Sequence, residues 1–81
     1  MLIIDCFGHN IIIDNKIVGY LKDNTLIVNG HKFADITDKG EIFFNQRLMG
    51  YVDDDGSIII KGHEAGYING NNDFVFYKEA I

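Results

Sequence analysis

A sixteen-residue pattern recurs along this chain and leaves few folds open to it. Residues 25–40, 41–56 and 57–72 align without a gap, residues 10–24 align one residue short, and residues 73–81 begin a further copy. In every full copy the second to fourth positions are apolar, the tenth is small and the twelfth is aliphatic. Self-similarity at a fixed period marks repeat architectures, in which each copy is one supersecondary unit. The sequence therefore predicts a single domain, residues 1–81, of about four units and a half-unit.

Each copy is predicted to form a β-hairpin. Its first strand is an apolar run of the residue types that strands favour. Two turn residues follow, and the Asn29-Gly30 pair is the strongest of these signals because both residues accept positive φ. The corresponding pairs are Asp14-Asn15, Asn45-Gln46 and Lys61-Gly62. No stretch sustains helical periodicity, so the fold class is all-β.

An array of hairpins exposes the edges of its end strands unless it closes on itself. We therefore expect a closed or ring-like array of about four hairpin repeats, in which the terminal strands pair. Because the fifth copy is only a half, the expected closing partners are an N-terminal strand, at about residues 2–6, and a C-terminal strand, at about residues 74–77.

The first strand of each copy is apolar on both of its faces. Alternate side chains of a strand point to opposite sides, so one face fills the core and the other needs a second layer or a partner. The residues on this second face are Ile12, Ile27, Phe43 and Ile59, with Val75 in the half-copy. Together with the small size of the chain, they favour self-association or an unknown protein partner.

Charge and composition narrow the classes of function. The net charge is −5 and the seven basic residues are scattered, which disfavours binding to nucleic acid or to an anionic membrane surface. The first residues carry no basic region and the apolar runs are short, so neither a signal peptide nor a membrane span is expected. A single cysteine, Cys6, fits a reducing compartment, and we expect a cytoplasmic protein.

Tyrosine fills the eleventh position in three copies, as Tyr20, Tyr51 and Tyr67, and Asp35 fills it in the other. A tyrosine offers a large apolar ring with a polar tip, which suits stacking on a sugar or on a partner chain. The alternative is that these rings cover the edges of the core with their hydroxyls in water, and Asp35 indicates a position open to solvent.

Other candidate residues are better explained by the repeat itself. Residues 53–56 read Asp-Asp-Asp-Gly, as a calcium loop begins, but Gly62 stands where such a loop needs a bidentate Glu, which favours an acidic turn. His31 and His63 share a position that holds cations in the other copies, which favours a solvated turn over a metal site. No metal and no cofactor is predicted.

The chain also lacks the pattern of an enzyme. Cys6 has no histidine close to it in sequence, and neither a nucleophile elbow nor a phosphate-binding loop is present. The plentiful carboxylates sit in repeated turn positions, as solvation dictates. We therefore expect a protein that is not an enzyme.

The repeat motif is similar to that of the bacterial four-fold β-flower proteins, in which short hairpins are arranged like petals about a pseudo-four-fold axis. The matching segments are residues 14–21 and 45–52, each of which ends in Gly-Tyr and an aliphatic residue, and the resemblance covers about residues 10–80. The second copy departs from it, with Ala34-Asp35 in place of Gly-Tyr. The resemblance implies the fold and a bacterial source, and it implies no activity.

These observations lead to one expected function and one alternative. The first is a non-enzymatic protein-interaction module of a bacterial cytoplasmic protein. The alternative is a small-ligand or glycan-binding module that uses the tyrosine column.

Overall fold

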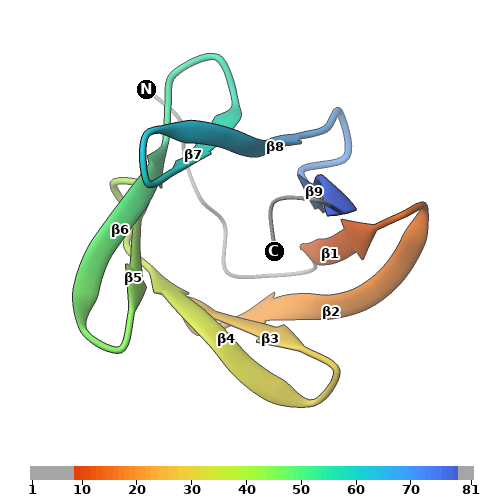
Figure 1. The fold of residues 1–81 in the computed structure, drawn as a ribbon. Helices are drawn as coiled ribbons and strands as arrows, with labels where there is room; N and C mark the ends of the chain where they lie inside the picture. The colour runs from red at the N-terminus through yellow and green to blue at the C-terminus, as the bar shows by residue number, and fades with distance from the viewer. Residues whose placement is uncertain (1–8, 79–81) are drawn as a thin grey trace.

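The computed structural model describes residues 9–78, and in this range nine strands form one closed barrel (Figure 1). The strands are β1 (Asn10–Ile13), β2 (Lys16–Lys22), β3 (Thr25–Val28), β4 (His31–Ile36), β5 (Glu41–Phe44), β6 (Arg47–Val52), β7 (Ser57–Ile60), β8 (His63–Ile68) and β9 (Phe74–Phe76). Each strand pairs with its neighbours in sequence, and the first pairs with the last. The prediction of an all-β, closed array of repeated hairpins is confirmed.

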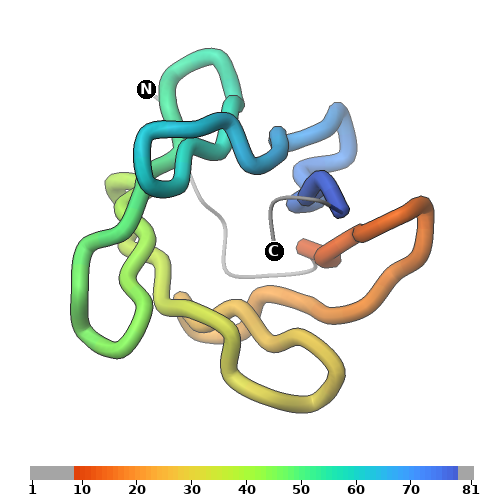
Figure 2. The backbone as a smooth tube through the Cα atoms, in the orientation of Figure 1, coloured from red at the N-terminus to blue at the C-terminus, as the bar shows by residue number. Residues whose placement is uncertain are grey.

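The seam of the barrel lies between β1 and β9, which run side by side in Figure 2. Their pairing is parallel, with Ile11 opposite Phe74 and Ile13 opposite Phe76. The parallel direction follows from the odd number of strands. Because every other pair of neighbours is antiparallel, the first and the ninth strand run in the same direction. The predicted closure is thus made by the first strand of the first copy. Residues 2–6, the segment we expected at the seam, lie outside the described part of the chain.

The hairpin turns have the backbone conformation that the sequence predicts. Both turn residues have positive φ in all four hairpins, for example 53° at Asn29 and 80° at Gly30. This matches the right-handed twist of the flanking strands. A second pair of this kind, Asp23-Asn24, joins the first copy to the second. It replaces the longer turns that end the other copies and accounts for the missing residue of the first.

Every hairpin contains a β-bulge at the same place, which the sequence analysis missed. The register shifts opposite the ninth position of each copy, so that Val18, Phe33, Met49 and Ala65 are the inserted residues. A bulge bends its strand and changes which side chains face inward. Beyond the bulges the hairpins lean away from the ring, and their tips project outward (Figure 1).

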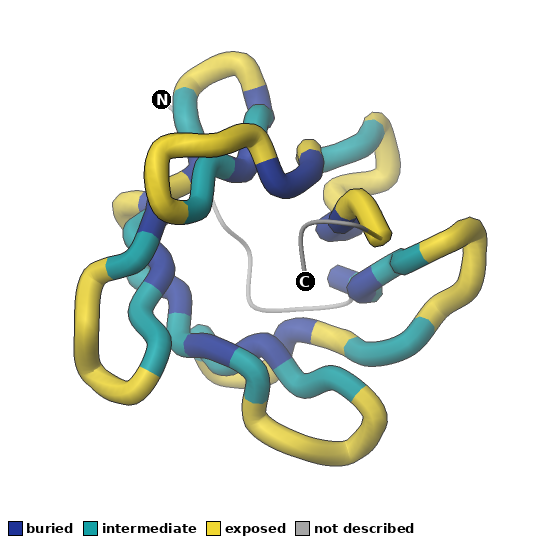
Figure 3. The backbone as a smooth tube through the Cα atoms, viewed as in Figure 1, coloured by how far each residue is buried: buried dark blue, intermediate teal, exposed yellow. Residues whose placement is uncertain are grey.

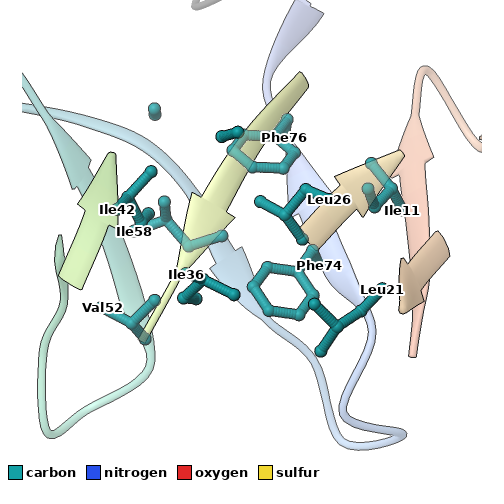
Figure 4. Packing of buried hydrophobic residues seen from close by; sticks show 11 residues of the cluster. Ile11, Leu21, Leu26, Ile36, Ile42, Val52, Ile58, Phe74 and Phe76 are labelled. Atoms are coloured by element: carbon teal, nitrogen blue, oxygen red, sulfur yellow. The ribbon is translucent and has the colours of Figure 1, made fainter. Parts of the chain in front are cut away.

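The buried residues lie on the inner side of the ring, and the exposed hairpin tips lie outside it (Figure 3). The second position of each copy is fully buried: Ile11, Leu26, Ile42 and Ile58. Phe74 and Phe76 from β9 are the largest of the fully buried side chains and lie among the aliphatic residues of the other strands (Figure 4). Phe33 packs edge-on against both Phe44 and Phe76, at centroid distances of 5.2 and 5.8 Å, and so links β4 to β5 and β9.

The small residue at the tenth position allows adjacent hairpins to approach. A Cβ at Gly50 would lie 2.0 Å from the carbonyl oxygen of Ile59, and Gly19 and Gly66 are equally confined. Ala34 holds this position in the second copy, and there the ladder between β4 and β5 has only two pairs, ending at Asp35. The methyl group of Ala34 is therefore accommodated by a shorter ladder.

Candidate functional site

The apolar column that we predicted as an interface lies on the outer face of the barrel, where it is half-covered. Ile12, Ile27, Phe43 and Ile59 have intermediate burial and do not belong to the core cluster. Two of them have an apolar cross-strand neighbour, because Ile17 pairs with Ile12 and Leu48 pairs with Phe43.

The more exposed apolar residues are Ile17 and Leu48, at 67% and 58% exposure. Sequence reasoning missed them because strict alternation places the eighth position on the same face as the tenth. The bulge between these positions reverses that assignment.

The three predicted tyrosines are exposed but do not share a site. Tyr20 lies opposite Ile27, Tyr51 opposite Ile59 and Tyr67 opposite Val75, so each stands at a different junction between copies. Outward-facing residues at separate junctions of a closed barrel diverge, so the three rings do not meet in one concavity.

A groove of about 430 Å³ lies at the junction of β6 and β7, and we call it the β6–β7 groove. It is lined by Glu41, Leu48, Met49, Gly50, Tyr51, Ile59 and Gly62. The two hairpins pair from Val52 to Gly50, and the bond from the Lys61 N–H to the Met49 carbonyl is the last between them. Past this point no ladder pair joins the two hairpins. Leu48 lies beyond the last bond, whereas Tyr51 lies opposite Ile59 within the paired segment.

Two other junctions differ from this groove in their side chains. On β4, beside the β4–β5 junction, the Lys32 ammonium pairs with the Asp35 carboxylate of the same strand at 2.9 Å. At the β8–β9 junction the Tyr77 ring packs on Tyr67 with a centroid distance of 6.1 Å, and its hydroxyl donates to Glu64 at 2.5 Å. This hydrogen bond is the main cause of the raised pKa of Tyr77.

The acidic turn at residues 53–56 uses its carboxylates to hold the backbone. The Asp53 carboxylate accepts hydrogen bonds from the N–H groups of Asp55 and Ser57, each at 3.1 Å. Thr37 and Asn69 hold their own turns in the same way, each with a side-chain oxygen that accepts hydrogen bonds from the N–H groups two and four residues later. The position thus needs an oxygen acceptor rather than a negative charge.

Substitution of Asp53 tests this role of the side chain. We expect Asp53→Asn to keep the melting temperature at pH 7 or raise it, because the amide oxygen still accepts both bonds and a charge is removed from a crowded turn. Asp53→Ala removes the acceptor and is expected to lower the melting temperature. Thermal unfolding of both variants provides the measurement, and equal melting temperatures for them would contradict the assigned role.

The same turn predicts a local pH dependence of stability. The hydrogen bond between the two carboxyl groups raises the pKa of Asp53 and lowers that of Asp55 from the ordinary value of 3.8. The contribution of Asp53 to folding stability is present below pH 3.8 and is lost as the pH rises through its raised pKa. The contribution of Asp55 is present above pH 3.8 and is lost as the pH falls through its lowered pKa. The turn is thus most stabilising near pH 3.8, where the pair shares one proton, and Asp53→Asn flattens this dependence.

The remaining candidates of the sequence analysis lie apart from the groove. His31 and His63 are exposed at the outer ends of their hairpins, beside the turns. Cys6 is outside the described residues. Within residues 9–78, no three His, Cys, Asp or Glu side chains gather as metal ligands would. The same range contains no helix of the length and apolarity needed to cross a membrane.

The seam contains a polar cluster that sequence reasoning missed. His9 is buried, and its Nδ1 contacts the Asn72 carbonyl. The Asp73 carboxylate accepts a hydrogen bond from the N–H of Asn10 at 3.1 Å, and the His9 ring packs edge-on against Phe74. These contacts tie the start of β1 to the start of β9.

Comparisons with known proteins found no match to this chain among models of protein families, curated proteins or solved structures.

Proposed function

We propose that this protein is a non-enzymatic protein-interaction module that contacts its partner through the outer face of the barrel. The observation that carries the proposal is the repeated exposure of large apolar side chains beside exposed tyrosines, as Ile17 with Tyr20 and Leu48 with Tyr51. Isolated exposed apolar residues are ordinary, but apolar groups gathered in a groove favour an interaction surface.

The hairpin arrangement also supports placing the chain among the bacterial four-fold β-flower proteins. Four hairpins surround one axis and lean outward like petals, with a half-copy that closes the ring. With this placement we propose a bacterial, cytoplasmic protein whose partner is a second copy or another protein.

Site-directed photo-crosslinking tests the interaction. We expect a benzoylphenylalanine at position 48, in the β6–β7 groove, to form a discrete protein adduct, whereas the same residue at Asp54, in the exposed outer turn, forms none. An adduct of the purified protein at twice its 9.2 kDa mass identifies a second copy, which light scattering then checks in solution. Another mass in a lysate of the native cells identifies a different protein. Equal labelling from both positions, or none from position 48, would contradict the proposal.

A small ligand or glycan is the second candidate, and the β6–β7 groove supports it. Its volume of about 430 Å³ lies within the range of small-molecule sites, about 300–1,000 Å³, and the Tyr51 ring offers a stacking surface. In this form of the hypothesis each tyrosine acts at its own junction rather than in a shared site. A ligand-binding function leaves position 48 without a protein adduct in the crosslinking experiment.

A further inference from the structure

We propose that the β6–β7 groove takes an aromatic side chain of a partner protein, with an adjacent basic residue of that partner paired to Glu41. This inference rests on the proposed interaction function and specifies the chemistry of the partner. It follows from how Tyr77 covers Tyr67 at the equivalent β8–β9 junction.

The β8–β9 junction shows what the floor of such a groove accepts. There the Tyr77 ring packs on Tyr67, the residue equivalent to Tyr51. The backbone enters both junctions in the same way. At the β8–β9 junction the Tyr77 N–H donates to the Ala65 carbonyl, and at the β6–β7 junction the Lys61 N–H donates to the Met49 carbonyl.

At Lys61 the chain then reverses, with a φ of 54°, and within residues 9–78 no aromatic ring packs on Tyr51. A ring supplied by a partner would therefore find the same platform at Tyr51.

The wall of the β6–β7 groove favours an apolar ring more strongly than the filled junction does. Leu48 occupies the position that Glu64 has at the β8–β9 junction, and Ile59 lies opposite Tyr51. A ring between Leu48 and Ile59 removes apolar surface from water, and contact with the Tyr51 ring adds the attraction of an aromatic pair.

Glu41 gives the groove its charge preference. Its carboxylate accepts a hydrogen bond from the Thr37 hydroxyl at 3.3 Å. Among the described residues the single ion pair joins Lys32 to Asp35, so the Glu41 carboxylate has no basic partner there. The Asp35 carboxylate does have a basic partner, the Lys32 ammonium of the same strand, so a carboxylate on the outer face of this barrel can hold a cation beside it. The net charge of −5 likewise favours a basic partner.

The experiment titrates capped tetrapeptides into the ¹⁵N-labelled full chain and follows amide chemical shifts. We expect Ac-Gly-Phe-Lys-Gly-NH2 to shift the signals of Gly50, Tyr51 and Gly62. Exchange of its Phe for Ala, or of its Lys for Glu, is expected to weaken binding.

Two substitutions and a matched control locate the contacts. Tyr51→Ala is expected to weaken binding of the Phe-Lys peptide about two- to twelvefold, the range of an aromatic pair. Glu41→Gln is expected to weaken it up to about fivefold, the range of an exposed ion pair, and to abolish the preference for Lys over Glu. Tyr20→Ala, at the equivalent position beside Asn10, is the control and leaves the shifts at Tyr51 unchanged.

Three results overturn the assignment. They are no binding of the Phe-Lys peptide, shifts that are scattered over the surface, and equal affinities for the three peptides. Failure of this proposal is distinguishable from failure of the interaction function. If position 48 crosslinks to a protein while the Phe-Lys peptide does not bind, the partner chemistry is wrong and the interaction function stands. If the peptide binds while position 48 gives no adduct, the groove is a binding site and the interaction function is wrong.

Discussion

Gly50→Ala is expected to cost about 3 kcal/mol or more of folding stability, at or above the upper end for overpacked sites. The added Cβ would lie 2.0 Å from the Ile59 carbonyl oxygen, which is a main-chain atom and cannot rotate aside as a side chain can. Relief requires separation of β6 from β7, which breaks the ladder between two copies. For a chain of this size the loss corresponds to a melting temperature lower by about 12–24 °C.

Gly70→Ala is the matched control for this substitution. Gly70 has no atom within 4 Å of an added Cβ, and its backbone lies outside the left-handed region, so the change is expected to be neutral or slightly stabilising. Chemical denaturation of both variants gives the free energies of unfolding. A Gly50→Ala variant as stable as Gly70→Ala would show that the close approach of the hairpins is not required.

Phe74→Ala is expected to cost about 3–5 kcal/mol, the usual range for a fully buried phenylalanine. Phe74 is 1% exposed and belongs to the three-residue strand that closes the barrel. Its loss opens a cavity and also weakens the seam, because among residues 9–78 β9 is the strand that joins β8 to β1. Urea unfolding gives the free energy, and hydrogen exchange reports whether the amides of β1 and β9 lose protection before those of β5 and β6.

Val75→Ala, on the outer face of the same strand, controls for a change in β9 itself. Val75 is half-buried outside the core cluster, so its truncation is expected to cost less than half as much as that of Phe74. Equal losses for the two variants, or uniform loss of protection in all strands for Phe74→Ala, would contradict a core role concentrated at the seam.

The sequence was sufficient to predict the architecture because one pattern is repeated in it. Apolar runs followed by two residues that tolerate positive φ define a hairpin locally. The half-copy at the end predicted that the terminal strands pair and close the array. Asn29-Gly30 and its counterparts have the conformation expected of them. The small tenth position likewise has a local cause, the approach of the next hairpin at Gly19, Gly50 and Gly66.

The bulges could not be predicted in this way, and the details of the site depend on them. A period of two assigns the eighth position to the inner face, whereas the inserted ninth residue turns Ile17 and Leu48 outward. Their exposure, rather than that of Ile12 and Phe43, gives the outer face its apolar character. The identity of the closing strand also depended on pairing between distant segments, which no local pattern encodes.

Of the candidate site, the repeat pattern showed that the tyrosines are equivalent but not that they are separated. The repeat shows that Tyr20, Tyr51 and Tyr67 are equivalent, and equivalence in a ring means that they face different directions. What distinguishes the junctions is the set of neighbours, such as Lys32 beside Asp35 or Tyr77 on Tyr67. These neighbours come from positions that vary between copies, so the repeat pattern carries no information about them.

The parallel seam means that a circular permutant of this barrel must keep a long connection between its two former ends. Antiparallel neighbours can be joined by two residues, but parallel strands need a crossover of about a dozen residues or more. Since β1 and β9 run in the same direction, a link from the end of β9 back to the start of β1 must travel the full height of the barrel. A permutant opened at the Asn29-Gly30 turn would therefore depend on a long connection across the old seam, whereas a barrel with an even number of strands would need only another tight turn.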